Sequence, residues 1–132
     1  MGYLLDTNIV SDLVRNPQGR TAARLQRIGG DQICTSIVVT AELHYGAIRR
    51  NSRRLTEQLE IVLSGIEILP LDFPADVTYG ELRTQLEENG QTIGPNDLLI
   101  AAHALALGHT LVTDNEREFS RVPGLKIENW LR

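Results

Sequence analysis

A chain of 132 residues, with 42% hydrophobic and 23% charged side chains, has the ordinary composition of one globular domain. The longest apolar run, residues 98–107, contains a histidine and is too short to span a bilayer, so no membrane segment is predicted. Cys34 is the only cysteine and no signal-peptide pattern opens the chain, which favours an intracellular, cytoplasmic protein. The net charge of −4 argues against a general nucleic-acid binder.

The first half of the chain alternates short β-rich runs with helical patterns. In order, it predicts a strand at 3–5, helices at 9–14 and 20–28, a strand at 32–35, and helices at 37–50 and 55–66. Thr7 or Asn8 is expected to cap the first helix, and Ser36 the third. The beginning of the third helix is so apolar that Glu42 is expected in or beside the core.

The second half continues the alternation. It predicts a strand at 67–71, a helix at 72–89, a helix at 98–107, a strand at 109–113, a polar loop and an edge strand at 125–128. Asn96 or Asp97 is expected to cap the buried helix, and Gly108 to end it in the left-handed conformation. The alternation predicts one α/β domain over residues 1–132, a three-layer α/β/α sandwich with a mostly parallel sheet.

Acidic residues stand where such a sheet binds ligands. Asp6 and Asp114 follow strands, Asp97 begins a helix, and Glu42 interrupts an apolar run. Taken singly, Asp6 and Asp97 could be helix caps and Asp114 a turn residue. Taken together, buried carboxylates repel one another unless they are protonated or bind cations. No lysine or arginine lies in the apolar segments that carry Asp6, Glu42 and Asp97.

Oxygen ligands of this kind favour Mg²⁺, with Mn²⁺ as a substitute, and zinc is disfavoured without cysteine or histidine partners. The three histidines show no metal-ligand spacing and are interpreted as structural. A magnesium site among carboxylates is suited to phosphoryl transfer, with water attacking a phosphodiester. Basic side chains that could steer RNA by its phosphates cluster within six positions, at Arg49, Arg50, Arg53 and Arg54. A solvated helix end explains the same cluster equally well.

Four segments in the same order resemble a known family. YLLDTNIVSDL, TAELHYGA, PNDLLIAAHALALGHTLVT and DNEREFSRVPGLKIENW are together similar to the PIN-domain family, in particular the VapC toxins of bacterial toxin–antitoxin pairs. LDTN by itself is a weak signal, but the four segments cover almost the whole chain. The resemblance implies a PIN-like nuclease fold over residues 1–132.

The resemblance also implies site roles. Asp6, Glu42 and Asp97 match the acids of a Mg²⁺-dependent ribonuclease site, in which Asp6 and Asp97 hold the metal and Glu42 completes its shell or orients water. Thr7 and Asn8 match supporting polar groups.

In the family, a fourth acid follows the last core strand in a T-x-D pattern. In this chain the pattern starts at Thr113, so Asn115 occupies the position of the acid, and the acid Asp114 stands one place earlier. The sequence leaves several candidates open for this position: Asp114, Asn115, Glu116 and Glu118.

The resemblance further implies a homodimer and a cognate VapB-like antitoxin that blocks the acidic cleft, often with a basic side chain. The tail VPGL-x-x-E-x-W is most similar to toxins that cut tRNA near the anticodon. The expected products carry a 3′ hydroxyl and a 5′ phosphate.

Two alternatives come from other functional classes. A catalytically weak PIN-fold module that binds RNA or a partner remains open because the T-x-D pattern is incomplete. A receiver-like signalling domain would need an adjacent acidic pair after the first strand and a lysine after the last, and the chain has Asp6-Thr7 and no lysine before Lys126.

Overall fold

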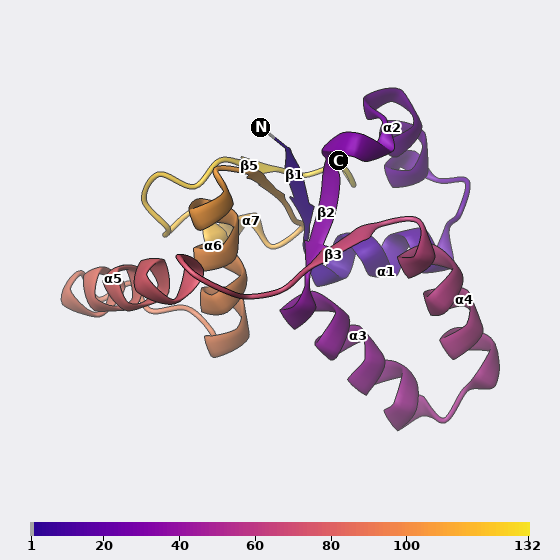
Figure 1. Cartoon of the computed structure of the whole chain (residues 1–132), viewed down its shortest axis with the longest axis horizontal. Coiled ribbons are helices and arrows are strands. Elements are labelled where there is room, and N and C mark those ends of the chain that lie inside the picture. The colour runs from indigo at the N-terminus through magenta and orange to yellow at the C-terminus, as the bar shows by residue number, and fades with distance from the viewer. Residues whose placement is uncertain (1) are drawn as a thin grey trace.

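The computed structural model describes residues 2–132. These residues form a five-stranded sheet flanked by helices (Figure 1). The strands are β1 (Tyr3–Leu5), β2 (Ile33–Ser36), β3 (Glu67–Leu69), β4 (Thr110–Val112) and β5 (Ile127–Glu128). The helices are α1 (Thr7–Arg15), α2 (Arg20–Ile28), α3 (Ile37–Arg50), α4 (Arg53–Ser64), α5 (Ala75–Glu88), α6 (Pro95–Leu107) and α7 (Glu116–Phe119), with a short 3₁₀ turn at Gly30–Gln32.

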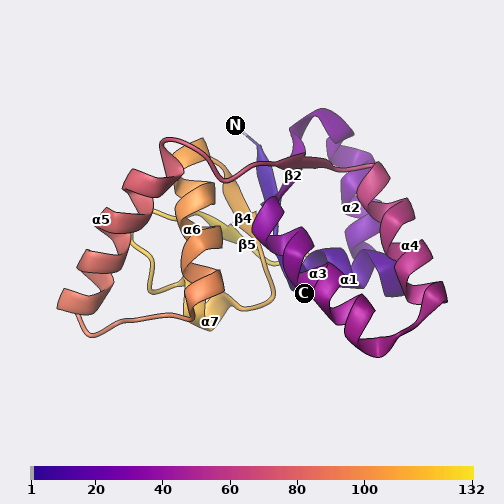
Figure 2. The same cartoon turned by 60° about the horizontal axis from the view of Figure 1, so that its bottom comes forward.

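All neighbouring strands are parallel, in the order β3-β2-β1-β4-β5. Helices α5 and α6 lie on one side of the sheet, and α1, α2 and α4 lie on the other (Figures 1 and 2). This arrangement confirms the predicted α/β/α sandwich. The sheet places β1 between β2 and β4, so the order of strands reverses at β1. Open parallel sheets bind ligands beyond the carboxyl ends of the strands at such a reversal.

The central strands are short and apolar because both of their faces are covered by helices. Leu4, Leu5, Leu111 and Val112 are fully buried. Leu5 pairs in register with Val112 of β4, and the Asp6 amide donates to the Val112 carbonyl at 2.9 Å. The chain therefore leaves β1 and β4 at the same level, which brings the residues after each strand together.

Three local predictions are wrong. Asp6, and not Thr7 or Asn8, is the N-cap of α1, since its carboxylate accepts from the amide of Thr7. The N-cap of α6 is Gly94, because Pro95 occupies the first helical position, where a missing N–H costs nothing. The expected polar loop after β4 contains the short helix α7, which is anchored by the fully buried Phe119.

Two other local predictions are confirmed. Ser36 caps α3, with its hydroxyl accepting from the Val38 amide at 3.1 Å. Gly108 ends α6 in the left-handed conformation, with φ of 69°. Among residues 2–132, no helix is both long and apolar enough to cross a membrane.

Candidate active site

Asp6 is the most buried acid of the site, with 3% of its surface exposed. The Thr113 hydroxyl donates to Asp6 Oδ2 at 2.7 Å, the Thr7 amide donates to Oδ1 at 2.8 Å, and the Asn8 amide group adds a contact to Oδ2 at 3.4 Å. Burial raises the pKa of Asp6, these hydrogen bonds oppose the rise, and the charge of Glu42 adds to it. The carboxylate is thus held in one orientation at the end of β1.

Two side chains connect the ends of β1 and β4. The Asn8 Oδ1 atom accepts from the Asp114 amide at 3.0 Å, while its amide group contacts Asp6. The Thr113 hydroxyl donates to Asp6 and also accepts from the Asn115 amide at 3.0 Å. The turn after β4 is therefore fixed to the same carboxylate that ends β1.

Glu42 lies on α3 and is half-buried, at the rim of the core and not inside it. Its Oε1 atom accepts from the Thr7 hydroxyl at 2.6 Å, and its Oε2 atom accepts from the Asn96 amide group at 3.3 Å. The site thereby includes residues from the starts of α1 and α6 as well as from α3.

Asp97 occupies the first turn of α6, where the helix dipole favours a negative charge. Even so, its pKa is raised to about 7. Desolvation is the largest cause, followed by a hydrogen bond shared with Glu118 and by the charges of Asp6, Glu118 and Glu42. The acids are therefore close enough for their charges to oppose one another.

Glu118 is brought to the site by α7. Its Oε1 atom accepts from the Gly94 amide at 2.6 Å, which lowers the pKa of Glu118. The Asn115 amide group donates to Glu118 Oε2 at 2.9 Å and contacts Asp97 Oδ2 at 3.5 Å. Asn115 and Glu118 together occupy the region beside Asp97 where the sequence predicts a fourth acid.

Asp114 turns toward the C-terminal segment. Its Oδ1 atom accepts from the Asn129 amide group at 3.0 Å and from Arg132 Nε at 3.4 Å. Asn129 also donates to Glu116 Oε2 at 2.9 Å. Within residues 2–132, no hydrogen bond joins the Asp114 or Glu116 carboxylate to the other three predicted acids. The fold therefore gathers Asp6, Glu42 and Asp97 but directs Asp114 and Glu116 elsewhere.

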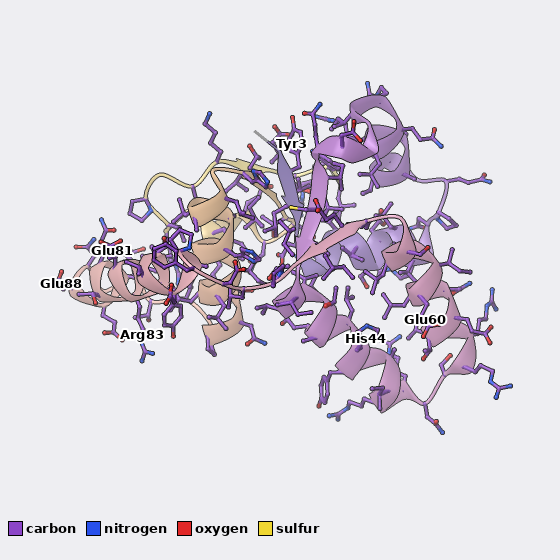
Figure 3. All side chains as sticks on the ribbon, viewed as in Figure 1. Tyr3, His44, Glu60, Glu81, Arg83 and Glu88 are labelled. Atoms are coloured by element: carbon purple, nitrogen blue, oxygen red, sulfur yellow. The ribbon has the colours of Figure 1, made fainter. Side chains whose placement is uncertain are left out.

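The predicted arginine cluster lies at the corner between α3 and α4, where nitrogen-tipped side chains project outward (Figure 3). Arg49 donates to the Tyr45 hydroxyl at 2.9 Å. Arg50 lines a cavity that also contains Glu42, and none of the other three arginines lines it. The structure therefore separates Arg50 from Arg49, Arg53 and Arg54.

The histidines make local contacts away from the acids. His103 is buried and its Nδ1 atom lies 2.9 Å from the Ser36 hydroxyl, and burial lowers the His103 pKa. His109 Nδ1 accepts from the Gly2 amide at 3.2 Å.

The donor chemistry of the site fits a hard divalent cation. Asp6, Glu42, Asp97 and Glu118 offer only oxygen atoms, and no ion pair within residues 2–132 neutralises any of them. The charges of Asp6, Glu118 and Glu42 all act on Asp97, but the described residues contain no group of three or more histidine, cysteine or acidic side chains placed closely enough to hold a metal ion as they stand. A bound cation would offset the repulsion that raises the Asp97 pKa.

Sequence reasoning did not single out Thr113, although its hydroxyl forms the shortest side-chain hydrogen bond to Asp6. The signals were its place at the end of a predicted strand and its place as the threonine of the T-x-D pattern. Neither signal says which residue Thr113 contacts until β4 is known to lie beside β1. Glu118 was one of several candidates for the fourth position, and its selection depended on the path of α7.

Comparison with known proteins finds relatives that match this chain over nearly its whole length. The PIN domain family profile matches residues 3–125. A Rickettsia felis protein called ribonuclease VapC2 is 44% identical over 134 residues, covering 98% of both chains. A Salmonella typhimurium protein called tRNA(fMet)-specific endonuclease VapC is 34% identical over 129 residues, covering 97% of both chains.

A solved structure matches along the whole chain as well. The crystal structure of VapBC2 from Rickettsia felis, bound to a promoter DNA fragment, superposes with a TM-score of 0.90 at 40% identity. The match covers 98% of this chain and 99% of that one. Family profile, sequence relatives and fold all agree, and the chain therefore belongs to the PIN-domain family and, within it, to the VapC ribonucleases.

Proposed function

We propose that this ribonuclease is a Mg²⁺-dependent endoribonuclease, with residues 1–132 acting as one PIN-like nuclease domain. The observation that carries the proposal is the carboxylate cluster at the end of β1, in which no acid forms an ion pair within residues 2–132 and where burial and neighbouring acids raise the pKa of Asp97 to about 7. Asp6 and Asp97 would hold the ion, and Glu42 would complete its shell, with Mn²⁺ as a substitute.

Bound Mg²⁺ would supply the positive charge that stabilises an in-line attack of water on a phosphodiester. The residues of the chain prepare for this chemistry by fixing the ligands. Thr113 and the Thr7 amide hold the Asp6 carboxylate, the Thr7 hydroxyl holds Glu42, and Asn115 connects Asp97 with Glu118. Such supporting contacts orient metal ligands and increase their affinity.

We further propose tRNA, cut near the anticodon, as the substrate. This inference is supported by the Salmonella typhimurium relative, which is called tRNA(fMet)-specific, and by the resemblance of the tail ending at Trp130 to toxins that cut tRNA. The tail is part of the fold, since Trp130 is buried and packs at 5.4 Å between ring centroids against Tyr3. The same proposal places the protein in the cytoplasm, as the toxin of a toxin–antitoxin pair.

A VapB-like antitoxin is the proposed partner, because the related Rickettsia felis protein was solved as a VapBC complex. A basic side chain of that antitoxin would neutralise the acids beside Asp97. A homodimer is also proposed. Its support is an exposed apolar stripe along α3, formed by Ile37, Tyr45 and Ile48, which are 47%, 63% and 74% exposed.

The decisive experiment incubates antitoxin-free protein with total small RNA in Mg²⁺, in a chelator, and as the Asp97→Asn variant. Asp76→Asn is the matched control, because Asp76 is an exposed acid in the first turn of α5. We expect defined fragments that disappear with the chelator and with Asp97→Asn but persist with Asp76→Asn. Sequencing the fragment ends identifies the RNA and the scissile bond.

Cleavage that survives Asp97→Asn would contradict the proposed site. A folded protein that binds Mg²⁺ but cuts no RNA would instead support the binding-only alternative. For the dimer, Ile48→Glu should give a monomer by analytical ultracentrifugation, whereas Ile61→Glu on α4, an equally exposed isoleucine at 71%, should not.

A further inference from the structure

A cavity of about 240 Å³ lies between α1, α3 and α4, beside the acid cluster. Its apolar floor is formed by Val14, Leu43, Ala47, Leu55 and Leu59. Its polar rim is formed by Thr7, Ser11, Arg15, Glu42 and Arg50. The cavity thus combines an apolar interior with charged groups of both signs at its mouth.

The cavity is continuous with the catalytic site. Glu42 and Thr7, whose side chains are joined by a 2.6 Å hydrogen bond, belong both to the acid cluster and to the cavity rim. A polymer that reaches the acids can therefore place a neighbouring unit in the cavity without leaving the surface.

The rim also carries two positively charged side chains, Arg15 and Arg50, that are available to bind a ligand. Neither Arg15 nor Arg50 forms an ion pair with a carboxylate anywhere in the described part of the chain. Arginine guanidinium groups bind phosphate through paired N–H donors. A phosphate at this rim would lie next to a phosphodiester held at the acids.

Gly46 is the position at which the cavity can be filled by a substitution. It lies in the middle of α3 and lines the cavity, and a Cβ atom built there would meet no atom within 4 Å. Close packing therefore does not require glycine, although glycine destabilises a helix interior relative to alanine. The missing side chain keeps the wall of the cavity open.

We propose that the cavity between α1, α3 and α4 binds the base of a nucleotide adjacent to the scissile phosphodiester, with Arg15 and Arg50 holding the flanking phosphate. The proposal rests on the ribonuclease function proposed above and adds the subsite that selects the sequence to be cut. The cavity is smaller than the roughly 300–1,000 Å³ sites that enclose drug-sized ligands, so one base fits and a longer segment does not.

The test uses a randomised pool of single-stranded octaribonucleotides in Mg²⁺, with sequencing of the fragment ends. Wild type should show a preferred base next to the cut. Gly46→Leu places a side chain in the cavity and should abolish that preference and lower kcat/KM for the preferred sequence by at least about tenfold. Gly80→Leu is the matched control, since Gly80 is an exposed glycine in the middle of α5 with nothing within 4 Å.

Arg50→Gln tests the phosphate contact without filling the cavity. It should lower kcat/KM and reduce the slope of log(kcat/KM) against log salt concentration by about 0.7, the value for one phosphate contact to a single strand. Arg27→Gln removes the same charge from α2, outside the cavity, and should change neither quantity. This variant also provides a result if Gly46→Leu fails to fold, which thermal melting would reveal.

The outcomes separate the two levels of the proposal. If wild type shows no Mg²⁺-dependent cleavage, the ribonuclease function fails and the subsite fails with it. If wild type cleaves, and Gly46→Leu cleaves with the same base preference and rate, the function stands and the subsite is wrong. That second result would leave the cavity to a protein partner. An equal loss for all sequences would also overturn base binding.

Discussion

The Thr113 hydroxyl is the shortest link between Asp6 and the rest of the site, and it is fully buried. Thr113→Val keeps the shape of the side chain but removes its hydroxyl. The buried Oδ2 atom of Asp6 then loses its shortest hydrogen bond. We expect kcat/KM to fall by roughly 10- to 100-fold, the usual cost of losing a contact that orients a metal ligand. Thr113→Ser, which keeps the hydroxyl, should retain most activity in the same cleavage assay.

The fourth position of the site can be assigned by two conservative variants. Glu118→Gln removes the charge that faces Asp97 and should strongly reduce cleavage. Asp114→Asn should leave cleavage nearly unchanged, because the Asp114 carboxylate is held by Asn129 and Arg132. Single-turnover cleavage rates of the two variants decide whether Glu118 or Asp114 is the fourth acid. A slower rate for Asp114→Asn than for Glu118→Gln would assign the position to Asp114.

The charge of Asp97 also has a measurable effect on stability. Because its pKa is raised from 3.8 to about 7, the folded state binds a proton more tightly than the unfolded state. The associated stability is present below about pH 4 and is lost as pH rises through 7. In metal-free protein, Asp97→Asn should therefore raise the melting temperature at pH 8 and have little effect at pH 4. An increase of the same size at both pH values would contradict the raised pKa.

Helix α7 is the element that carries Glu118 to the site, and it has only four residues. It is too short to be stable by itself, so its position depends on Phe119, which is fully buried. Phe119→Ala should lower the free energy of unfolding by about 3–5 kcal/mol and displace Glu118 from Gly94.

Chemical denaturation measures the loss for Phe119→Ala. Phe119→Leu, which fills most of the volume, should lose less. Near-equal losses for the two variants would show that α7 is held by something other than the volume of this side chain.

At the scale of elements, most helices and strands could be predicted from the sequence because their apolar residues follow helical or strand periodicity. The predicted start of α1 was two residues too late and that of α6 three residues too late, since several adjacent polar residues could serve as caps. Helix α7 was missed because EREF has no room for a repeat. Its helical form is set by the burial of one phenylalanine, which no local pattern expresses.

At the scale of the whole molecule, Mg²⁺ should stabilise the fold in a pH-dependent way. A ligand bound only by the folded state adds about 2.7 kcal/mol at 100 times its Kd. Protons compete for Asp97, whose pKa is about 7, so the Mg²⁺-induced rise in melting temperature should be large at pH 8 and small at pH 5.5. The cleavage rate should likewise decrease as the pH is lowered from 8 to 5.5. Asp97→Asn should abolish the Mg²⁺ effect, and Asp76→Asn should preserve it.

The sequence by itself determined the α/β architecture and the family, and it named three acids that the fold brings together in the candidate site. Periodicity is a local property, and the segments around Asp6, Glu42 and Asp97 are distinctive in their order. Only the tertiary structure decided that Thr113 supports Asp6, that Glu118 and not Asp114 faces Asp97, and that Arg15 and Arg50 share a cavity with Glu42. These facts depend on the alignment of β4 with β1 and on how α1, α3 and α4 pack. Contacts between residues far apart along the chain arise from that packing, and no local pattern encodes them.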